Sequence, residues 1–263
     1  MHQEIIRFRE LYKIMRIQLV SYFLKIQSKD KVNITAEIIN NSTSDLIVFS
    51  GNTLDTIDDI FKLASLIKNK KATALIEVSQ ISIGDLNADI INSPFLIKKG
   101  KLVNMHTFQF FATSSSIEHD RFLAEAFVNE LETRRQFKVK GCNCLILQCG
   151  ENNILKNNQS NDNNVVIRID DKSLIRRFKQ ILNNTDIILN IIHKPQYGNQ
   201  NKLHKRREYF SHNNRIYLST NNCTRLSSDA KSIQYVYKNG IKIDCPEPII
   251  DNYNRYMYRL FDL

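Results

Sequence analysis

A cysteine at the end of an apolar run is the residue of this chain best placed to act as a nucleophile. Cys149 follows the run Cys144–Gln148 and precedes Gly150-Glu151-Asn152-Asn153. A cysteine at a strand end, with glycine next, can leave the sheet on a tight turn and face a pocket. Backbone N–H groups of that turn can then point at a developing oxyanion. A free cysteine also commonly serves as a small buried hydrophobic residue, so this segment alone leaves both interpretations open.

The other cysteines do not complete a metal site or a disulfide framework. Cys142 and Cys144 alternate along the predicted strand and share a face, whereas Cys149 has the opposite parity. No CxxC pair or neighbouring histidine pair supplies four ligands, and the five cysteines are an odd number. We therefore expect no metal and no cofactor.

A basic segment indicates a second kind of chemistry, which is phosphate binding. Its cationic residues are Lys202, Lys205, Arg206 and Arg207. Aromatic neighbours such as Tyr197 could stack on bases, and the net charge of +10 fits a nucleic-acid-associated accessory protein. A chain rich in Lys, Asn and Ile also reaches such a charge without a binding site. The segment fits a solvated helix face with Phe210 inward equally well.

The apolar spacing predicts strands that alternate with helices and position these residues. Strands are expected at Met15–Phe23, Asp45–Phe49, Thr73–Val78, Cys144–Gln148, Val165–Ile169, Asp186–Ile192 and Arg215–Thr220. Helices are expected at 57–67, with Phe61 inward, at Glu118–Arg135, with Phe122 inward, at Leu174–Leu182 and at Leu203–Asn213. Hairpins are expected around Lys98–Lys101 and Lys238–Gly240. This order predicts one α/β domain over 15–263, preceded by an arm or short helix at 1–14.

Length and composition limit the class of protein. The 263 residues are 42% hydrophobic, which is enough for a sizeable core and too much for a disordered chain. No apolar run approaches the ~18 residues of a membrane helix, and charges scattered through the N-terminus do not resemble a signal peptide. We expect a cytoplasmic protein that does not bind a membrane.

Six segments, taken in order, resemble the nitrilase (carbon–nitrogen hydrolase) superfamily over nearly the whole chain. They are Ser44–Thr53, Asn92–Val103, Leu145–Glu151, Thr185–Asn190 with His193, Lys205–Asn222 and Ser232–Asp244. The first is similar to a family strand that ends in Pro-Glu, the second to the hairpin before the catalytic lysine, and the third to the nucleophile strand. The resemblance implies an α-β-β-α sandwich, a Cys nucleophile, a Glu base and a Lys that stabilises the tetrahedral intermediate. It also implies a small amide or nitrile ligand and a homodimer.

Two of the three catalytic positions depart from the family pattern. Gly51 stands where the resemblance places the glutamate, and Gln109 lies near the lysine position. No glutamate occurs between Ile38 and Ile76, and no lysine between Leu102 and Phe137, so a shift of register restores neither. A thiol with an ordinary pKa of ~8.5 needs a base, and one lost oxyanion donor typically costs ~10²–10³ in rate.

Carboxylates elsewhere could replace the missing base. Glu77 ends the next strand and could reach the pocket, or it could be a strand-end carboxylate in solvent or in a salt bridge. Glu118 matches a second, supporting glutamate of the family, or is an ordinary acid at a helix start. Glu151 and His193 are expected to line the same pocket.

These observations support three hypotheses. The leading one is a nitrilase-like pseudoenzyme whose amidohydrolase activity is weakened or lost, and which acts as a binding or scaffolding module. The first alternative is an active thiol amidohydrolase or acyltransferase that uses Cys149 with a displaced base such as Glu77. The second alternative is a nucleic-acid-associated accessory protein. Activity requires a base within hydrogen-bonding reach of the Cys149 sulfur.

Overall fold

The computed structural model describes residues 14–23, 26, 28–79, 92–113, 115–157, 165–193, 200–223 and 233–263. All of the predicted N-terminal arm except Ile14 lies outside the described residues, as does Tyr197. No helix in the described ranges is long and apolar enough to cross a membrane.

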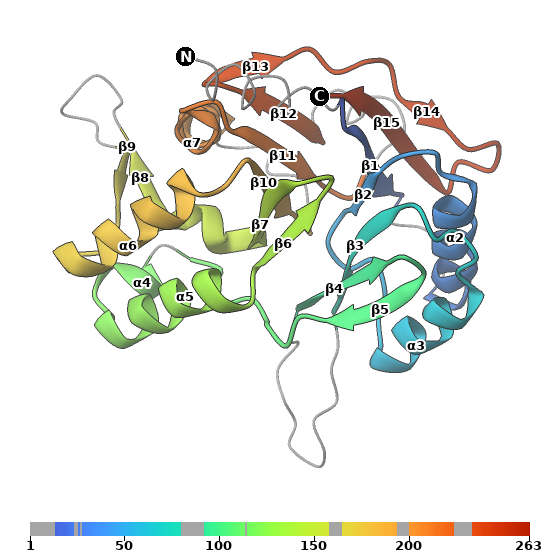
Figure 1. Ribbon diagram of the computed structural model, residues 1–263, viewed down its shortest axis with the longest axis horizontal. Coiled ribbons are helices and arrows are strands. Elements are labelled where there is room, and N and C mark those ends of the chain that lie inside the picture. The colour runs from blue at the N-terminus through green and yellow to red at the C-terminus, as the bar shows by residue number, and fades with distance from the viewer. Residues whose placement is uncertain are drawn as a thin grey trace, which may run out of the picture.

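Two sheets pack face to face in the part of the chain that the structure describes (Figure 1). The seven-stranded sheet has the order β14 (Ile249–Ile250), β15 (Tyr256–Asp262), β1 (Arg16–Tyr22), β2 (Leu46–Phe49), β3 (Thr73–Val78), β4 (Ser93–Lys98) and β5 (Lys101–Asn104). The six-stranded sheet has the order β13 (Ile241–Ile243), β12 (Gln234–Lys238), β11 (Ile216–Thr220), β10 (Ile187–Ile191), β7 (Cys142–Gln148) and β6 (Gln136–Val139). A separate ribbon pairs β8 (Leu155–Asn157) with β9 (Val165–Ile167).

Each sheet has three parallel strands at its centre. In the seven-stranded sheet β1, β2 and β3 run parallel, and in the six-stranded sheet β7, β10 and β11 do so. Parallel strands present their carboxyl ends at one edge of a sheet, where ligands commonly bind in α/β folds. Both sets of carboxyl ends meet, because the Gly51 N–H after β2 donates to the Ile192 carbonyl after β10 at 3.0 Å. Side chains that follow these strands are therefore brought together.

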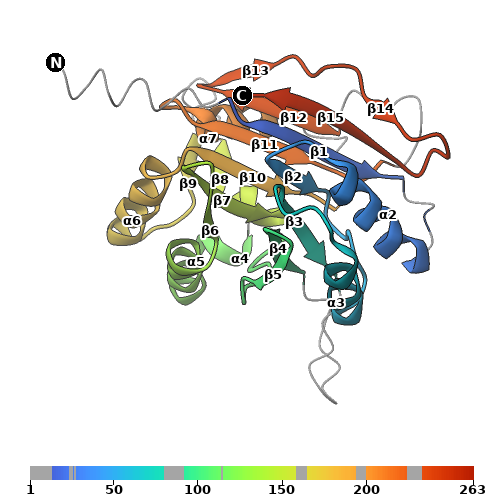
Figure 2. The same cartoon turned by 45° about the vertical axis from the view of Figure 1, so that its right-hand side comes forward.

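Helices cover both outer faces of the paired sheets, as Figures 1 and 2 show. The seven-stranded sheet is covered by α2 (Ser28–Asn41) and α3 (Ile57–Leu66). The six-stranded sheet is covered by α5 (Arg121–Thr133), α6 (Lys172–Asn183) and α7 (Gln200–Ser211). A third apolar cluster, which includes Leu19, Val48, Ile146 and Leu189, fills the space between the sheets. The layers are thus α-β-β-α, and the central strands are apolar on both faces because both faces are buried.

The structure corrects the predicted inner faces of two helices. In α3 the buried residues are Ile60 and Leu63, three positions apart, and Phe61 is 60% exposed. In α5 the buried stripe includes Phe127 and Leu131, and Phe122 is 86% exposed on the opposite side of the helix. The predicted helix Glu118–Arg135 is also divided, since α4 (Ser115–Glu118) ends before Asp120 caps the start of α5.

Candidate catalytic site at the carboxyl ends of both sheets

Cys149 lies on a tight turn directly after β7, as its sequence context predicts. It is the first residue of a short 3-10 helix, η1 (Cys149–Ile154), and its side chain is half-buried. The turn is held by Glu151, whose carboxylate accepts the Gln148 N–H at 2.8 Å. Gly150 is required by close packing, since a Cβ there would lie 2.3 Å from the Cα of Ala112. Gly150 thus allows the segment that contains Ala112 to pass directly against the turn that contains Cys149.

A buried ion pair joins this turn to the segment around Gln109. Arg135 and Glu151 are 3.0 Å apart with both side chains 0% exposed. The Arg135 guanidinium also donates to the Thr107 hydroxyl and the Phe108 carbonyl, both at 2.5 Å, and Glu151 accepts the Phe110 N–H at 3.0 Å. Glu151, predicted as a pocket residue, is therefore fully engaged in a structural pair, and Arg135 is buried rather than a helix-end charge in solvent.

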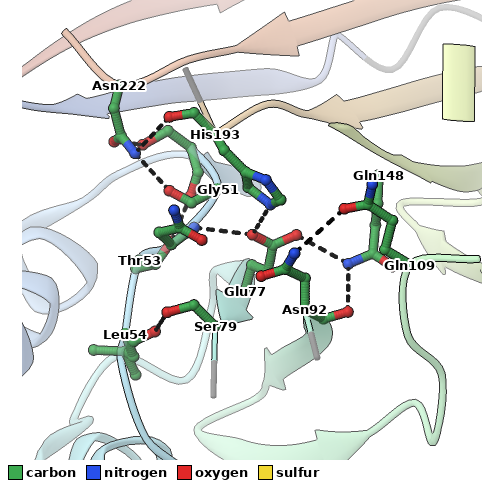
Figure 3. Close-up of polar contacts among 12 residues, drawn as sticks. Gly51, Thr53, Leu54, Glu77, Ser79, Asn92, Gln109, Gln148, His193 and Asn222 are labelled. Atoms are coloured by element: carbon green, nitrogen blue, oxygen red, sulfur yellow. Dashed lines mark hydrogen bonds and ion pairs between the residues drawn. The ribbon is translucent and has the colours of Figure 1, made fainter. Parts of the chain in front are cut away.

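The His193 ring occupies the space beside Gly51 (Figure 3). Gly51 follows β2 and His193 follows β10, so the two residues come from different sheets. A Cβ on Gly51 would lie 2.1 Å from the Cδ2 atom of His193 and 2.9 Å from the Oε2 atom of Glu77. At the position where the family resemblance placed a glutamate side chain, this chain holds an imidazole brought from the opposite sheet.

Glu77 lies beneath this ring and is 0% exposed, so it is not a carboxylate in solvent. Its Oε2 atom is 2.7 Å from Nε2 of His193 and accepts the Asn52 N–H at 2.9 Å. Its Oε1 atom accepts a hydrogen bond from Nε2 of Gln148 at 2.9 Å. Because Glu77 faces His193, the nitrogen that bonds to it is the one that carries a proton. These three contacts fix both carboxylate oxygens (Figure 3).

The Cys149 side chain lies close enough to the His193 ring to raise the pKa of His193, so the ring interacts with both the thiol and Glu77. Burial of the ring lowers the pKa of His193, but hydrogen bonds and negative charge from Cys149 and Glu77 outweigh burial and raise it to about 10. The imidazole is therefore protonated at neutral pH. A cysteine, a charged histidine and a buried glutamate in this order are the arrangement of a thiol nucleophile with its proton carrier.

Neutral amides occupy the place expected for the lysine. Gln109 is half-buried, its Oε1 atom accepts from Asn92 at 3.3 Å, and its Nε2 atom donates to the Phe111 carbonyl at 3.1 Å. The Gln148 amide adjoins it and donates to the Asn92 carbonyl at 2.9 Å. In the described residues, the hydrogen bonds and ion pairs of Glu77 and His193 involve no lysine. The cation nearest to Cys149 in this group is His193 itself.

Solved structures share this arrangement of layers and strands. A glutamine-dependent NAD(+) synthetase from Cytophaga hutchinsonii superposes with a TM-score of 0.58 and 10% identity over 95% of this chain and 43% of the synthetase. An amidase of the nitrilase superfamily from Nesterenkonia AN1 superposes with a TM-score of 0.56 and 7% identity over 94% of this chain and 90% of the amidase. The fold is that of the nitrilase superfamily. This confirms the predicted α-β-β-α sandwich.

A further similar structure is an amidase solved with a covalent adduct. It is a variant of the Nesterenkonia enzyme with the acetamide moiety of fluoroacetamide covalently added at the active-site cysteine, and it superposes with a TM-score of 0.56 and 8% identity over 94% of this chain and 90% of the enzyme. No protein-family model and no curated protein matches this sequence. This chain spans less than half of the synthetase.

The remaining predicted site residues lie elsewhere on the nitrilase-like fold. Glu118 pairs with Lys156 at 2.6 Å and with Arg168 at 2.5 Å, and the hydrogen bond from Lys156, followed by the charge of Arg168, lowers its pKa. These contacts do not include Cys149, His193 or Glu77.

The basic segment does not form one exposed strip on the nitrilase-like fold. Its two arginines, Arg206 and Arg207, are 8% and 2% exposed, because helical spacing puts them on the same face as Phe210. Arg207 lies 3.7 Å above the Tyr235 ring, and Lys205 pairs with Glu208 at 3.0 Å. Lys202 is exposed. The prediction that Phe210 points inward is confirmed, since this residue is 0% exposed.

The sequence did not indicate three polar residues that the structure brings to the site. They are Asn92, Gln148 and Asn222, of which the last two are almost fully buried. Gln148 is a polar residue at the end of an apolar run, whereas Asn222 lies two residues after β11, whose last two residues are already polar. The positions of both become informative only when the strand ends are known to meet.

Proposed function

We propose that this chain is a cysteine-dependent enzyme acting on carbon–nitrogen bonds, with Cys149 as nucleophile, His193 as proton carrier and Glu77 as the residue that orients His193. One observation carries the proposal, which is that the His193 ring bonds to the buried Glu77 carboxylate at 2.7 Å and also interacts with the Cys149 side chain. It occupies the space that Gly51 leaves. The missing glutamate has thus been replaced by a base from the other sheet.

The reaction follows from the positions of these groups. With Nε2 of His193 engaged by Glu77, we assign to Nδ1 the exchange of protons in the reaction. The Cys149 sulfur attacks an amide carbonyl carbon as a thiolate, and the C=O electron pair moves to oxygen. The tetrahedral intermediate collapses as the C–N bond breaks, and His193 gives its proton to the leaving nitrogen. Water, or an acceptor amine, then attacks the thioester and loses its proton to His193, which restores the thiolate and the imidazolium.

Glu77 has a positioning and electrostatic role in this scheme. Its bonds to Asn52 and Gln148 hold the carboxylate so that Oε2 faces the ring, which selects the Nε2–H tautomer and stabilises the imidazolium. This differs from the glutamate expected from the resemblance, which takes the thiol proton directly. The imidazolium also supplies positive charge beside the thiolate, in place of a lysine.

A nitrilase-like binding or scaffolding module remains the second candidate function. The neutral Gln109 favours it, because a site without a fixed cation loses stabilisation of the oxyanion. A small amide is the ligand that we propose in either case, on the strength of the fold likeness to amidases. Homodimer formation and a cytoplasmic location stay predictions. The inward-facing Arg206 and Arg207 give the nucleic-acid alternative no support.

Alkylation of Cys149 by iodoacetamide at pH 6.0, measured peptide by peptide by mass spectrometry, tests the proposal. Cys142 and Cys245 are also half-buried and serve as internal controls, and burial raises the pKa of each. We expect Cys149 to react at least about tenfold faster than either control, because a neighbouring imidazolium favours the thiolate. The substitution His193→Ala should remove this advantage.

Turnover of simple aliphatic amides, followed by ammonia release, separates the two candidate functions. An active enzyme releases ammonia in a reaction abolished by Cys149→Ala and reduced at least about 100-fold by His193→Ala. If His193→Ala leaves the alkylation rate of Cys149 at pH 6.0 unchanged, the proposed thiolate–imidazolium pair is wrong. Fast alkylation with no turnover over a panel of amides would instead support the binding module.

A further inference from the structure

Asn222 connects the ends of three strands, because it follows β11 and bonds to residues that follow β2 and β10. It is 3% exposed, and its Nδ2 donates to the Gly51 carbonyl at 2.6 Å and to the His193 carbonyl at 3.2 Å (Figure 3). Its Oδ1 accepts the Ser50 hydroxyl at 2.5 Å. One buried side chain therefore holds the backbone on both sides of the contact between Gly51 and the His193 ring.

The orientation of this amide is determined by its neighbours. Backbone carbonyls can only accept hydrogen bonds, so the two that face Asn222 require the nitrogen of the amide. The Ser50 hydroxyl, which can donate, faces the oxygen. A reversed amide would place its oxygen against two carbonyls, and an aspartate would bury a charge there. The arrangement thus requires an asparagine in this one orientation.

We propose that Asn222 is a positioning residue for His193, acting through the His193 and Gly51 backbone; this rests on the proposed function. The Ile192 carbonyl accepts the Gly51 N–H, and the next carbonyl along the chain, that of His193, accepts from Asn222. The backbone is therefore held at both of these consecutive residues. The ring lies so close to Gly51 that a Cβ there would clash with it. Holding Gly51 and His193 on the same amide fixes their separation and directs the ring toward Cys149 and Glu77.

Another asparagine provides a matched control far from the site. The Asn69 amide also donates to two backbone carbonyls, those of Ile39 and Ser42, both at 2.9 Å. Asn69→Ala and Asn222→Ala each remove one amide that bridges two carbonyls. A purely structural role for Asn222 predicts that both variants lower the melting temperature and that neither changes the state of His193.

The test is an NMR titration of the His193 ring in wild type, Asn222→Ala and Asn69→Ala. We expect His193 to titrate at least one pH unit lower in Asn222→Ala than in wild type, because a displaced ring loses part of its contact with Glu77 and Cys149. Asn69→Ala should keep the wild-type titration. Acid-side alkylation of Cys149 should fall at least about fivefold in Asn222→Ala alone.

Two outcomes separate failure of this inference from failure of the proposed function. If Asn222→Ala leaves the His193 titration at its wild-type value, the positioning role is wrong. If His193→Ala leaves Cys149 alkylation unchanged while Asn222→Ala shifts the His193 titration, the positioning role holds and the catalytic proposal is wrong. Should Asn222→Ala not fold, Asn222→Leu fills a similar volume and removes both hydrogen bonds to the Gly51 and His193 carbonyls. It should lower the His193 titration in the same direction, and an unchanged value would equally overturn the inference.

Discussion

An alanine at position 51 would place a methyl group inside the space that the His193 ring fills. The added Cβ would lie 2.1 Å from Cδ2 of His193, whereas ordinary contact begins near 3.4 Å, so the ring would have to withdraw by about 1 Å or more. The φ angle of Gly51 is not in the left-handed region, so its backbone accepts alanine and crowding is the main effect. Overpacking of this kind typically costs ~1–3 kcal/mol of stability. Displacing a catalytic group by ~1 Å can lower the rate ~10²-fold.

A double-mutant cycle measures whether the loss of stability and of Cys149 reactivity in Gly51→Ala is caused by the clash with the His193 ring. In wild type, Gly51→Ala should lower the free energy of unfolding in urea by ~1–3 kcal/mol and abolish the acid-side alkylation of Cys149. In a His193→Ala background the ring is gone and the tightest remaining contacts of the Cβ are Oε2 of Glu77 at 2.9 Å and the Cα of residue 193 at 3.1 Å, so the same substitution should cost clearly less. A smaller cost in the His193→Ala background is the expected result. If the substitution costs the same in both backgrounds, the ring is not what fills the space at Gly51.

Three further predictions follow from other contacts. Gly150→Ala should destabilise the fold by ~1–3 kcal/mol in urea unfolding, because its Cβ would meet the Ala112 backbone at 2.3 Å; a loss below 0.5 kcal/mol would contradict this packing. Glu151→Gln should cost ~3–5 kcal/mol by leaving the buried Arg135 charge unpaired, and Arg135→Met combined with Glu151→Leu should cost less than that single change. Because the pKa of His193 is raised to about 10, its ion pair stabilises fully below the unfolded value near 6.5 and is lost as pH rises through 10. The excess stability of wild type over His193→Gln should therefore shrink between pH 6.5 and 10, and a difference that grows would refute the assignment.

Much of the fold could be predicted from the sequence because its central strands are apolar on both faces. Thr73–Val78 coincides with β3, and the other predicted strands of the two parallel sets differ from the observed bounds by at most two residues at either end. The sequence did not indicate α2 or β15. The α2 helix contains many β-branched residues, namely Val32, Ile34, Thr35, Ile38 and Ile39, which have a low helix propensity. The segment is nevertheless helical because its packing on the sheet outweighs this low propensity.

The candidate site was only partly predictable. The absence of a glutamate near Gly51 could be seen directly, and so could the carboxylate of Glu77 on the neighbouring strand. The contact between Glu77 and His193 could not, because the two residues are 116 positions apart and belong to different sheets. Alternation along a strand shows which residues share a face, but it does not show which strand ends face each other across a sandwich.

The division of the site between two sheets has a consequence for how activity would fail under stress. Gly51 and Glu77 belong to one sheet, and Cys149, His193 and Asn222 to the other, so separation of the layers by a few ångströms removes Glu77 from His193 while every strand stays paired. Partial openings generally need less free energy than global unfolding. The site would then act as an early reporter of loosening between the layers. In rising denaturant, Cys149 would lose its acid reactivity before the far-ultraviolet circular dichroism of the sheets changes.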